Sequence, residues 1–248
     1  MKLSELIDYT GQLLQVERFR DYCPNGLQVE GRVEVRTLVS GVTASMALLE
    51  RAAALDADLV LVHHGYFWKG EDPCVVGIRK NRLKFLLERD ISLVAYHLPL
   101  DAHPELGNNA RLAQLLDFTL QGWVGEQSLV AHGVVNQPGN LHEITARIAQ
   151  RLGRQPLEFG DPAKTVRTIA WCSGAAQDCI EAALALGVDA FLTGEVSERT
   201  FHIAQETGIA FISAGHHATE RYGIQALGAH LAERHQLNHH FIDIDNPV

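Results

Sequence analysis

The chain has 248 residues, which is enough for one large domain or two small ones with a buried core. Apolar residues make up 46% and charged residues 21%, and no apolar run approaches the ~18 residues of a membrane-spanning helix. The formal net charge of −9 argues against non-specific nucleic-acid binding, which needs a basic surface. We therefore expect a globular protein with no membrane partner and no strong nucleic-acid partner.

The cysteines and the N-terminal segment predict the compartment. The four cysteines form no C-x-x-C pair, which makes a disulfide framework an unfavourable interpretation. The segment "MKLSELIDYTGQLL" lacks the basic region, apolar core and cleavage site of an export signal, and its leucines recur at helical spacing. These features predict a cytoplasmic protein with reduced thiols.

Strands and helices alternate through the first half of the chain. The strands are apolar along their whole length, which is typical of a parallel sheet covered by helices on both faces. The pattern predicts strands over 37–43, 57–64 and 91–97 and helices over 44–56, 79–90 and 108–117.

The middle of the chain, about 122–166, breaks this alternation. It contains one clear helix, 141–152, with loops and short strands around it. The alternation then resumes, and glycines predict the ends of two helices. The pattern predicts strands over 168–174, 188–195, 209–215 and 239–244 and helices over 176–187, 198–208 and 218–235.

The two halves of the sequence resemble each other. "ERAAALDADLVLVHHG" (50–65) aligns with "EAALALGVDAFLTGEV" (181–196) at a constant offset of 131, which places Asp58 on Asp189. We interpret this as a divergent duplication, although any two strand–helix–strand units share some likeness. The expected fold class is α/β with two similar lobes, 1–125 and 126–248, and a metal site in the cleft between them. In such folds ligands lie outside the carboxyl ends of the strands.

Three predicted strand ends carry side chains that bind metals. If "HATER" begins a helix, His216 and Glu220 share one face of it at i,i+4 spacing. Taken singly, each histidine is more typically a solvated residue, and the i,i+4 pair is also typical of a helix surface. The convergence of three such ends on one sheet edge favours a metal site. The residues concerned are His63, His64, His97, Asp101, His216, His217 and Glu220.

The adjacent histidines at the end of "LVLVHHG" favour two ions over one. Successive side chains of a strand point to opposite faces, so His63 and His64 make a poor chelate for a single ion. Each can instead bind one ion of a pair about 3.5–4 Å apart. Asp101 or Glu220 can bridge such a pair. Imidazole and carboxylate ligands suit Zn, Fe, Mn or Ni better than Ca or Mg.

The segment "GYFWKGEDP" follows the double histidine and offers substrate contacts. Tyr66 and Trp68 can stack on a flat ring, and Lys69 can meet an anionic group. Packing or a subunit contact is the commoner use of such an aromatic cluster. No phosphate-binding glycine loop, G-x-S-x-G turn or H-E-x-x-H motif is present.

Five segments together resemble the GTP cyclohydrolase I type 2 (Nif-three-like) family, close to its enterobacterial members. These are "NGLQVEG", "VLVHHGYFWKGE", "HLPLDAHPELGNNARLA", "DAFLTGEVSE" and "AGHHATERYGIQAL". The resemblance extends, in order, over almost the whole chain. Glycine follows the double histidine where proline is frequent in that family. The large domain that some relatives carry between the halves is absent.

The resemblance implies a Nif-three-like fold of two similar lobes, a homohexameric toroid and a dinuclear metal centre facing its cavity. It also implies two divalent ions per subunit. His97 matches a family histidine near that centre and is a candidate for proton transfer. The ligands that the resemblance implies are His63, His64, Asp101, His216 and Glu220, with the two carboxylates as bridges.

Two functions follow as hypotheses. The first is a metal-dependent hydrolase, in which two ions activate a bridging water toward a nucleotide or related heterocycle, including a GTP cyclohydrolase-like reaction. A peptidase or a phosphoesterase would use the same chemistry. The alternative is a non-enzymatic metal-binding or scaffold ring. The family name does not establish the activity of each member.

Overall fold

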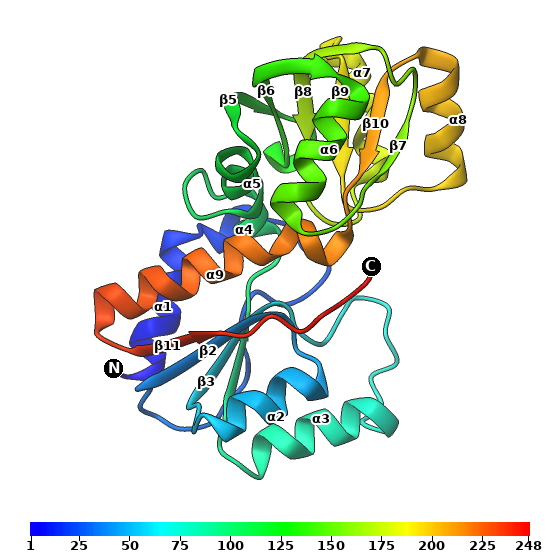
Figure 1. The fold of residues 1–248 in the computed structure, drawn as a ribbon. Coiled ribbons are helices and arrows are strands. Elements are labelled where there is room, and N and C mark those ends of the chain that lie inside the picture. The colour runs from blue at the N-terminus through cyan, green and yellow to red at the C-terminus, as the bar shows by residue number, and fades with distance from the viewer. The chain divides into compact units, whose positions relative to one another are not determined.

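The structure is a computed structural model that describes residues 1–248 as an α/β protein with two sheets (Figure 1). The chain forms two compact units, the first of residues 1–107 and 223–245 and the second of residues 108–222 and 246–248. The sequence placed the division after residue 125. The observed division differs from this expectation because α5 (Asn108–Leu116) already belongs to the second unit, and because the chain returns to the first unit within α9 (His216–His235).

The first unit contains a five-stranded sheet in the order β1-β4-β3-β2-β11. Strands β2, β3, β4 and β11 are parallel, and β1 pairs with β4 in the antiparallel direction. The strands are β1 (Gly26–Val29), β2 (Thr37–Thr43), β3 (Leu59–His64), β4 (Ser92–Ala95) and β11 (Asn238–Phe241), and the helices are α1 (Leu3–Leu13), α2 (Met46–Ala54), α3 (Gly77–Leu87) and α4 (Leu98–Ala102).

Apolar side chains on both faces of this sheet explain the continuous apolar strands. Leu59 and Leu61 of β3 pack in a cluster with α1 and with α9, whereas Val60 and Val62 pack in a cluster with α2 and α3. The alternation follows the two-residue period of a strand. Each fully buried aliphatic side chain contributes about 1.5–3 kcal/mol. Both faces therefore hold the carboxyl end of β3, and its histidines, in place.

The second unit contains a six-stranded sheet in the order β5-β6-β8-β9-β10-β7. Strands β8, β9 and β10 are parallel, and the others pair in the antiparallel direction. The strands are β5 (Phe118–Val124), β6 (Val130–Asn140), β7 (Leu157–Phe159), β8 (Thr165–Trp171), β9 (Ala190–Thr193) and β10 (Ala210–Ser213). The remaining helices are α6 (Leu141–Leu152), α7 (Ile180–Leu186) and α8 (Glu198–Thr207).

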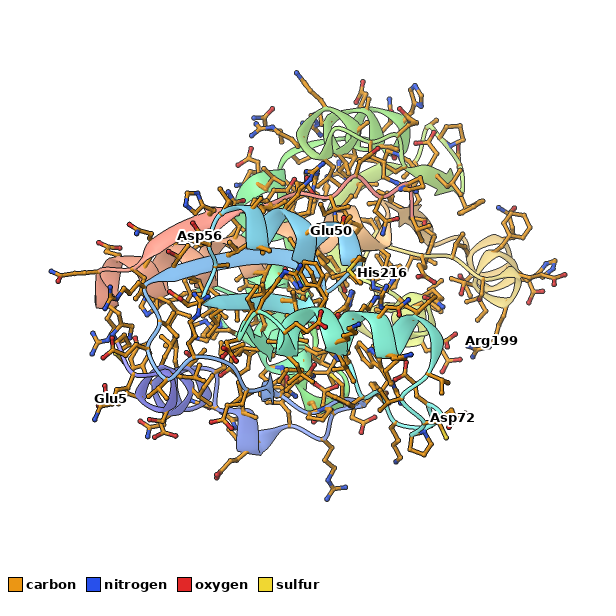
Figure 2. The ribbon with its side chains drawn as sticks, turned by 90° about the horizontal axis from the view of Figure 1, so that it is seen from below. Glu5, Glu50, Asp56, Asp72, Arg199 and His216 are labelled. Atoms are coloured by element: carbon orange, nitrogen blue, oxygen red, sulfur yellow. The ribbon has the colours of Figure 1, made fainter.

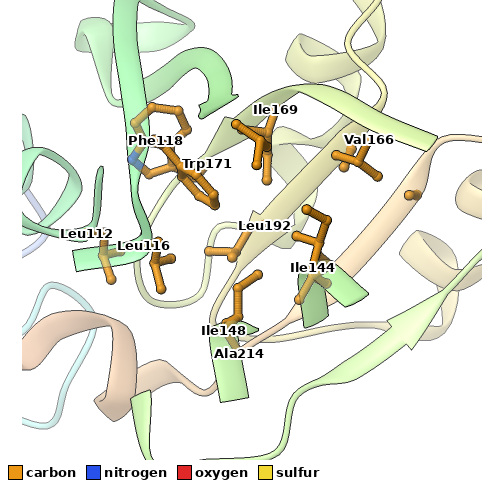
Figure 3. Close-up of a cluster of buried hydrophobic side chains, with 14 of the residues drawn as sticks. Leu112, Leu116, Phe118, Ile144, Ile148, Val166, Ile169, Trp171, Leu192 and Ala214 are labelled. Atoms are coloured by element: carbon orange, nitrogen blue, oxygen red, sulfur yellow. The ribbon is translucent and has the colours of Figure 1, made fainter. Parts of the chain in front are cut away.

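Helices cover both faces of this sheet as well. Figure 3 shows the cluster that contains Leu112 and Leu116 of α5, Ile144 of α6 and Trp171 of β8. A second cluster joins α7 and α8 to the opposite face, through residues that include Phe191 and Phe211. β6 is an eleven-residue strand where the sequence indicated loops and short strands.

The registers and hydrogen bonds of the two sheets repeat at the offset seen in the sequence. Leu38 of β2 pairs with Leu59 of β3, and Ile169 of β8 pairs with Ala190 of β9, each 131 residues further on. Asp58 and Asp189 make the same contact. Oδ2 of Asp58 accepts from the backbone N–H groups of residues 36 and 37 at 2.9 and 3.0 Å, and Oδ2 of Asp189 accepts from those of residues 167 and 168, both at 2.9 Å. These shared details support the duplication hypothesis.

The helix boundaries follow the sequence closely. Gly187 and Gly208 end α7 and α8 in the left-handed conformation, with φ of 68° and 72°. One boundary affects the site, because α9 begins at His216 and not at residue 218. His216 and Glu220 therefore both lie in the first two turns of this helix. None of the helices combines the length and the apolar character needed to cross a membrane.

Candidate metal centre

The double histidine lies at the carboxyl end of β3, but its rings do not point apart. The ring centroids of His63 and His64 are 4.6 Å apart, with an angle of 45° between the ring planes. This differs from the opposite-facing arrangement that a regular strand predicts. Gly65 follows directly, and a Cβ at this position would overlap the side chains of Gln28 and Ala95. The close approach of these segments thus requires glycine.

The next strand brings two further side chains to the same end of the first unit. His97 follows β4 and immediately precedes α4, and Asp101 lies one turn along this helix, with its backbone N–H donating to the carbonyl of His97 at 3.2 Å. Nε2 of His63 is 3.6 Å from Oδ1 of Asp101. Nitrogen atoms of His63, His64 and His97 all lie within 4.8 Å of one another. The first unit thus gathers three imidazoles and a carboxylate.

Each of these three histidines uses Nδ1 for a hydrogen bond within the protein. Nδ1–H of His63 donates to the carbonyl of Tyr96 at 2.9 Å, and Nδ1 of His64 shares a hydrogen bond of 3.3 Å with the hydroxyl of Thr43. Nδ1–H of His97 donates to Oδ1 of Asp21 at 2.8 Å. A hydrogen bond at Nδ1 orients the ring and leaves Nε2 as the coordinating nitrogen, which is the usual arrangement for metal-binding histidines.

Asp21 is held in place by four donors. Its Oδ1 accepts from His97 and from the backbone N–H of Tyr22 at 2.6 Å, and its Oδ2 accepts from Nδ2 of Asn25 at 2.8 Å and from the backbone N–H of Leu98 at 3.0 Å. Burial alone would raise the pKa of Asp21, but the hydrogen bond and charge of His97, with Asn25 and Tyr22, lower this pKa to about 2. Sequence reasoning missed Asp21, because nothing in its own segment marks it as a partner of residue 97.

The second unit holds the other two predicted ligands next to each other. Nε2 of His216 lies 3.1 Å from Oε2 of Glu220, and Nδ1–H of His216 donates to Oε1 of Glu195 at 2.7 Å. Burial would lower the pKa of His216, but Glu220 and Glu195 together raise this pKa to about 9. Glu195 occupies the position of His64 in the sequence repeat, a signal that pointed to this residue although it was not assigned a role.

Gly174 makes room for the carboxylate of Glu220. It follows β8 with a φ of +67°, and a Cβ there would overlap Oε1 of Glu220 and lie 3.3 Å from Nε2 of His216. Its backbone N–H donates to the hydroxyl of Thr219 at 3.0 Å, which fixes the loop against α9. Glycine is required here both by the backbone conformation and by the space that the carboxylate occupies.

The donor atoms suit a transition-metal ion. The first unit offers imidazole nitrogens and a carboxylate, and the second offers one imidazole and a carboxylate. This combination favours Zn, Fe, Mn or Ni. The hydrogen bonds at Nδ1 provide the outer contacts that such ligands need. The predicted ligands in each unit therefore fit a metal by their chemistry.

The aromatic segment after the double histidine borders a cavity of about 510 Å³ in the first unit. Tyr66 lines it but is buried, and its hydroxyl donates to the carbonyl of Ala44 at 2.8 Å. Trp68 also lines it, with its ring centroid 5.9 Å from that of His64. Lys69 is exposed and outside the lining. The cations of the lining are Arg79 and Arg82 of α3, which sequence reasoning missed because both resemble ordinary surface residues of a helix.

The duplicated α/β sheets and the paired histidine and carboxylate clusters define a class of protein: a two-unit α/β protein with candidate metal-binding side chains at its strand ends. A family model described as Duf34/NIF3 (NGG1p interacting factor 3) matches residues 1–247. The chain belongs to this family, and the family resemblance noted in the sequence is confirmed.

Curated relatives match along their whole length. A GTP cyclohydrolase 1 type 2 homolog of Pseudomonas aeruginosa is 56% identical over 249 aligned positions, which cover 99% of this chain and 98% of the relative. The homolog of the enterobacterium Yersinia pestis is 54% identical, with full coverage of both chains.

Solved structures match the fold equally well. A protein named ybgI, described as of unknown function, has a TM-score of 0.97 and 53% identity, with full coverage of both chains. A protein of Thermus thermophilus has a TM-score of 0.89 and 35% identity, again with full coverage of both chains.

Proposed function

We propose that the protein is a dinuclear metal-dependent hydrolase whose ligands come from both units. His63, His64 and Asp101 of the first unit and His216 and Glu220 of the second would hold two divalent ions. The observation that carries the proposal is the uniform use of Nδ1. All three histidines at the strand ends of the first unit, and His216 in the second, bind a protein group through Nδ1. The Nε2 atoms of His63 and His216 lie 3.6 and 3.1 Å from the carboxylates of Asp101 and Glu220.

Ions bound by these residues would supply a water whose pKa is lowered toward neutrality. The chain's own contribution is orientation and proton transfer. His97 would receive or donate a proton at Nε2, because Asp21 holds the proton of Nδ1 in place. Trp68 and Tyr66 line the adjacent cavity and would exclude water from a bound ring. A nucleotide or related heterocycle is the substrate class favoured by the names of the curated relatives.

Metal content and turnover test this proposal together. The wild-type protein, reconstituted separately with Zn, Mn, Fe and Ni, is screened against nucleotides, esters, amides and phosphoesters beside the His63→Ala/His64→Ala variant. We expect metal-dependent turnover in the wild type, and loss of both metal and turnover in the variant with its circular dichroism unchanged. His202→Ala is the matched control, because this histidine lies on the exposed face of α8.

Two results would contradict the proposal. Equal metal content in the wild type and the double variant would remove these histidines from the ligand set. Metal lost from the variant without metal-dependent turnover in the wild type would favour the alternative, a non-enzymatic metal-binding or scaffold ring.

The assembly and compartment belong to the same proposal. We propose a homohexameric ring, on the family resemblance, and a cytoplasmic location, in agreement with four cysteines that form no disulfide. Light scattering coupled to size-exclusion chromatography measures the mass of the assembly, with six times 27.3 kDa expected.

A further inference from the structure

The cavity beside β3 has the size of a small-molecule site. Its volume of about 510 Å³ lies within the roughly 300–1,000 Å³ typical of ligand pockets. His64, a proposed metal ligand, lines one side, and Tyr66 and Trp68 line the aromatic part. Arg79 and Arg82, which are three residues apart on α3, line a further side. A ligand in this cavity would therefore meet aromatic surface, positive charge and a ligand of the proposed metal centre.

The charge of Arg79 is already satisfied by the protein. Its guanidinium forms an ion pair with the carboxylate of Glu71 and donates to the backbone carbonyl of Asp72. Glu71 also accepts from the backbone N–H of Trp68 at 3.3 Å. These contacts tie the loop before α3 to the helix, so Arg79 serves to shape the cavity wall.

Arg82 is different, because no acidic side chain pairs with it. The carbon at the centre of its guanidinium group lies 5.8 Å from the centroid of the Tyr66 ring. Its Nε–H is buried and has no hydrogen-bond partner in the protein. This Nε–H is covered by protein atoms, so a ligand in the cavity would meet the positive charge of Arg82 and not this donor, and no carboxylate of the protein neutralises that charge. The hydroxyl of Tyr66 donates to the carbonyl of Ala44 and leaves the charge unmatched.

The remaining carboxylate of the lining does not oppose an anion strongly. Asp72 is exposed, and its Oδ1 accepts from the backbone N–H of Cys74 at 2.9 Å. Figure 2 shows Asp72 at the outer edge of the loop that precedes α3, where water screens its charge. The cavity lining thus contains the positive charge of Arg82, which no carboxylate neutralises, and the exposed carboxylate of Asp72.

We propose that this cavity binds the oxyanion group of a small substrate, with Arg82 as the anion-binding residue. A guanidinium offers several N–H donors in a fixed plane, which match the oxygens of a phosphate or a carboxylate. The oxyanion at Arg82 would place the rest of the substrate beside Trp68 and His64. This inference deepens the proposed function, because it names the chemical class of the substrate and the side from which it reaches the centre.

Binding of simple anions to the chelator-treated full chain tests the site without turnover. The nitrogen-15 resonance of Arg82 Nε–H is followed while inorganic phosphate or acetate is added, and calorimetry gives the affinity. We expect this resonance to shift with at least one of the two anions. We expect Arg82→Gln to weaken that binding about ten-fold or more, and Arg82→Lys to weaken it less.

Arg89→Gln is the matched control. Arg89 follows α3 and stacks over Phe85 at 3.9 Å, outside the cavity lining, so this variant should bind the anion as the wild type does. An unshifted Arg82 resonance with both anions, or equal affinity in the wild type and Arg82→Gln, would overturn the inference.

The inference and the proposed function fail in different experiments. His63→Ala should keep anion binding within about two-fold, because His63 does not line the cavity, while it loses the metal. With an active substrate, Arg82→Gln should raise KM about ten-fold and leave kcat within about three-fold. Anion binding without any turnover would support the anion site and contradict the hydrolase proposal. Turnover with an unchanged KM in Arg82→Gln would support the hydrolase proposal and contradict the anion site.

Discussion

Replacing Asp21 with asparagine should destabilise the first unit, and the cost follows from its hydrogen bonds. The carboxylate accepts two donors on each oxygen. An asparagine offers one oxygen and one NH2, so two of the four donors lose their acceptor in either orientation of the amide. A hydrogen bond to a charged group contributes about 1.5–3 kcal/mol. We therefore expect Asp21→Asn to lower the free energy of unfolding by about 3 kcal/mol.

Urea denaturation at pH 7 and amide hydrogen exchange at residues 22 and 98 measure this effect. For a chain of this length, 3 kcal/mol corresponds to a decrease in Tm of about 6–12 °C. Exchange at one of these two amides should accelerate most, because they donate to different oxygens of Asp21 and asparagine keeps only one of these oxygens. Asp178→Asn is the matched control. Asp178 forms an exposed ion pair with Arg199, so its change should stay within about 0.5 kcal/mol.

The same variant predicts a pH dependence. The pKa of Asp21 lies at about 2, below its ordinary 3.8, so its ionised form stabilises the folded state. This stabilisation is complete above pH 3.8 and is lost as the pH falls toward 2. The stability gap between wild type and Asp21→Asn should therefore narrow below pH 4. A variant as stable as the wild type at pH 7, or a gap of constant size down to pH 3, would refute the role of Asp21.

Three further substitutions test the duplicated framework and the second unit. Asp58→Ala and Asp189→Ala should each lower the free energy of unfolding, measured by urea denaturation, by about 2–4 kcal/mol, because each leaves two backbone N–H groups without an acceptor. A negligible loss in either variant would contradict the shared role of the two carboxylates. Gly174→Ala should displace Glu220 and lower the free energy of unfolding by about 1–3 kcal/mol. If the proposed ligand set is correct, this variant should also bind less metal, measured by mass spectrometry. Gly153→Ala is its control, because Gly153 has a similar φ of +68° with open space around it.

Most of the framework was predictable because it depends on local patterns. The apolar runs of β2, β3 and β4 identify buried strands, and Gly187 and Gly208 identify helix ends. The repeat offset predicted the equivalence of Asp58 and Asp189, which their hydrogen bonds support. Mixed pairing in the second sheet was not predictable, because antiparallel partners such as β6 and β8 are set by long-range packing.

The candidate site also contains residues that the sequence predicted and residues that it did not. His63, His64 and Asp101 were found because ligand residue types at a strand end are a local signal. Asp21 was missed, since its contact with His97 joins residues 76 positions apart and depends on the turn that follows Asp21. Arg82 was missed because its sequence neighbours on α3 are also basic, and only the cavity distinguishes it from them.

The order in which the units are encoded has a consequence for synthesis on the ribosome. The second unit is almost continuous, with residues 108–222 in one stretch, whereas the first needs residues 223–245 to be complete. Until these residues emerge, β2 lacks its neighbour β11, and Leu38 and Leu59 lack the cover of Leu227.

Domains generally fold as units during translation. The sheet that contains the double histidine is therefore synthesised early but completed last, and the edge of β2 stays exposed in the interval. A chain truncated after residue 222 and released should hold a nearly complete second unit and an incomplete first sheet.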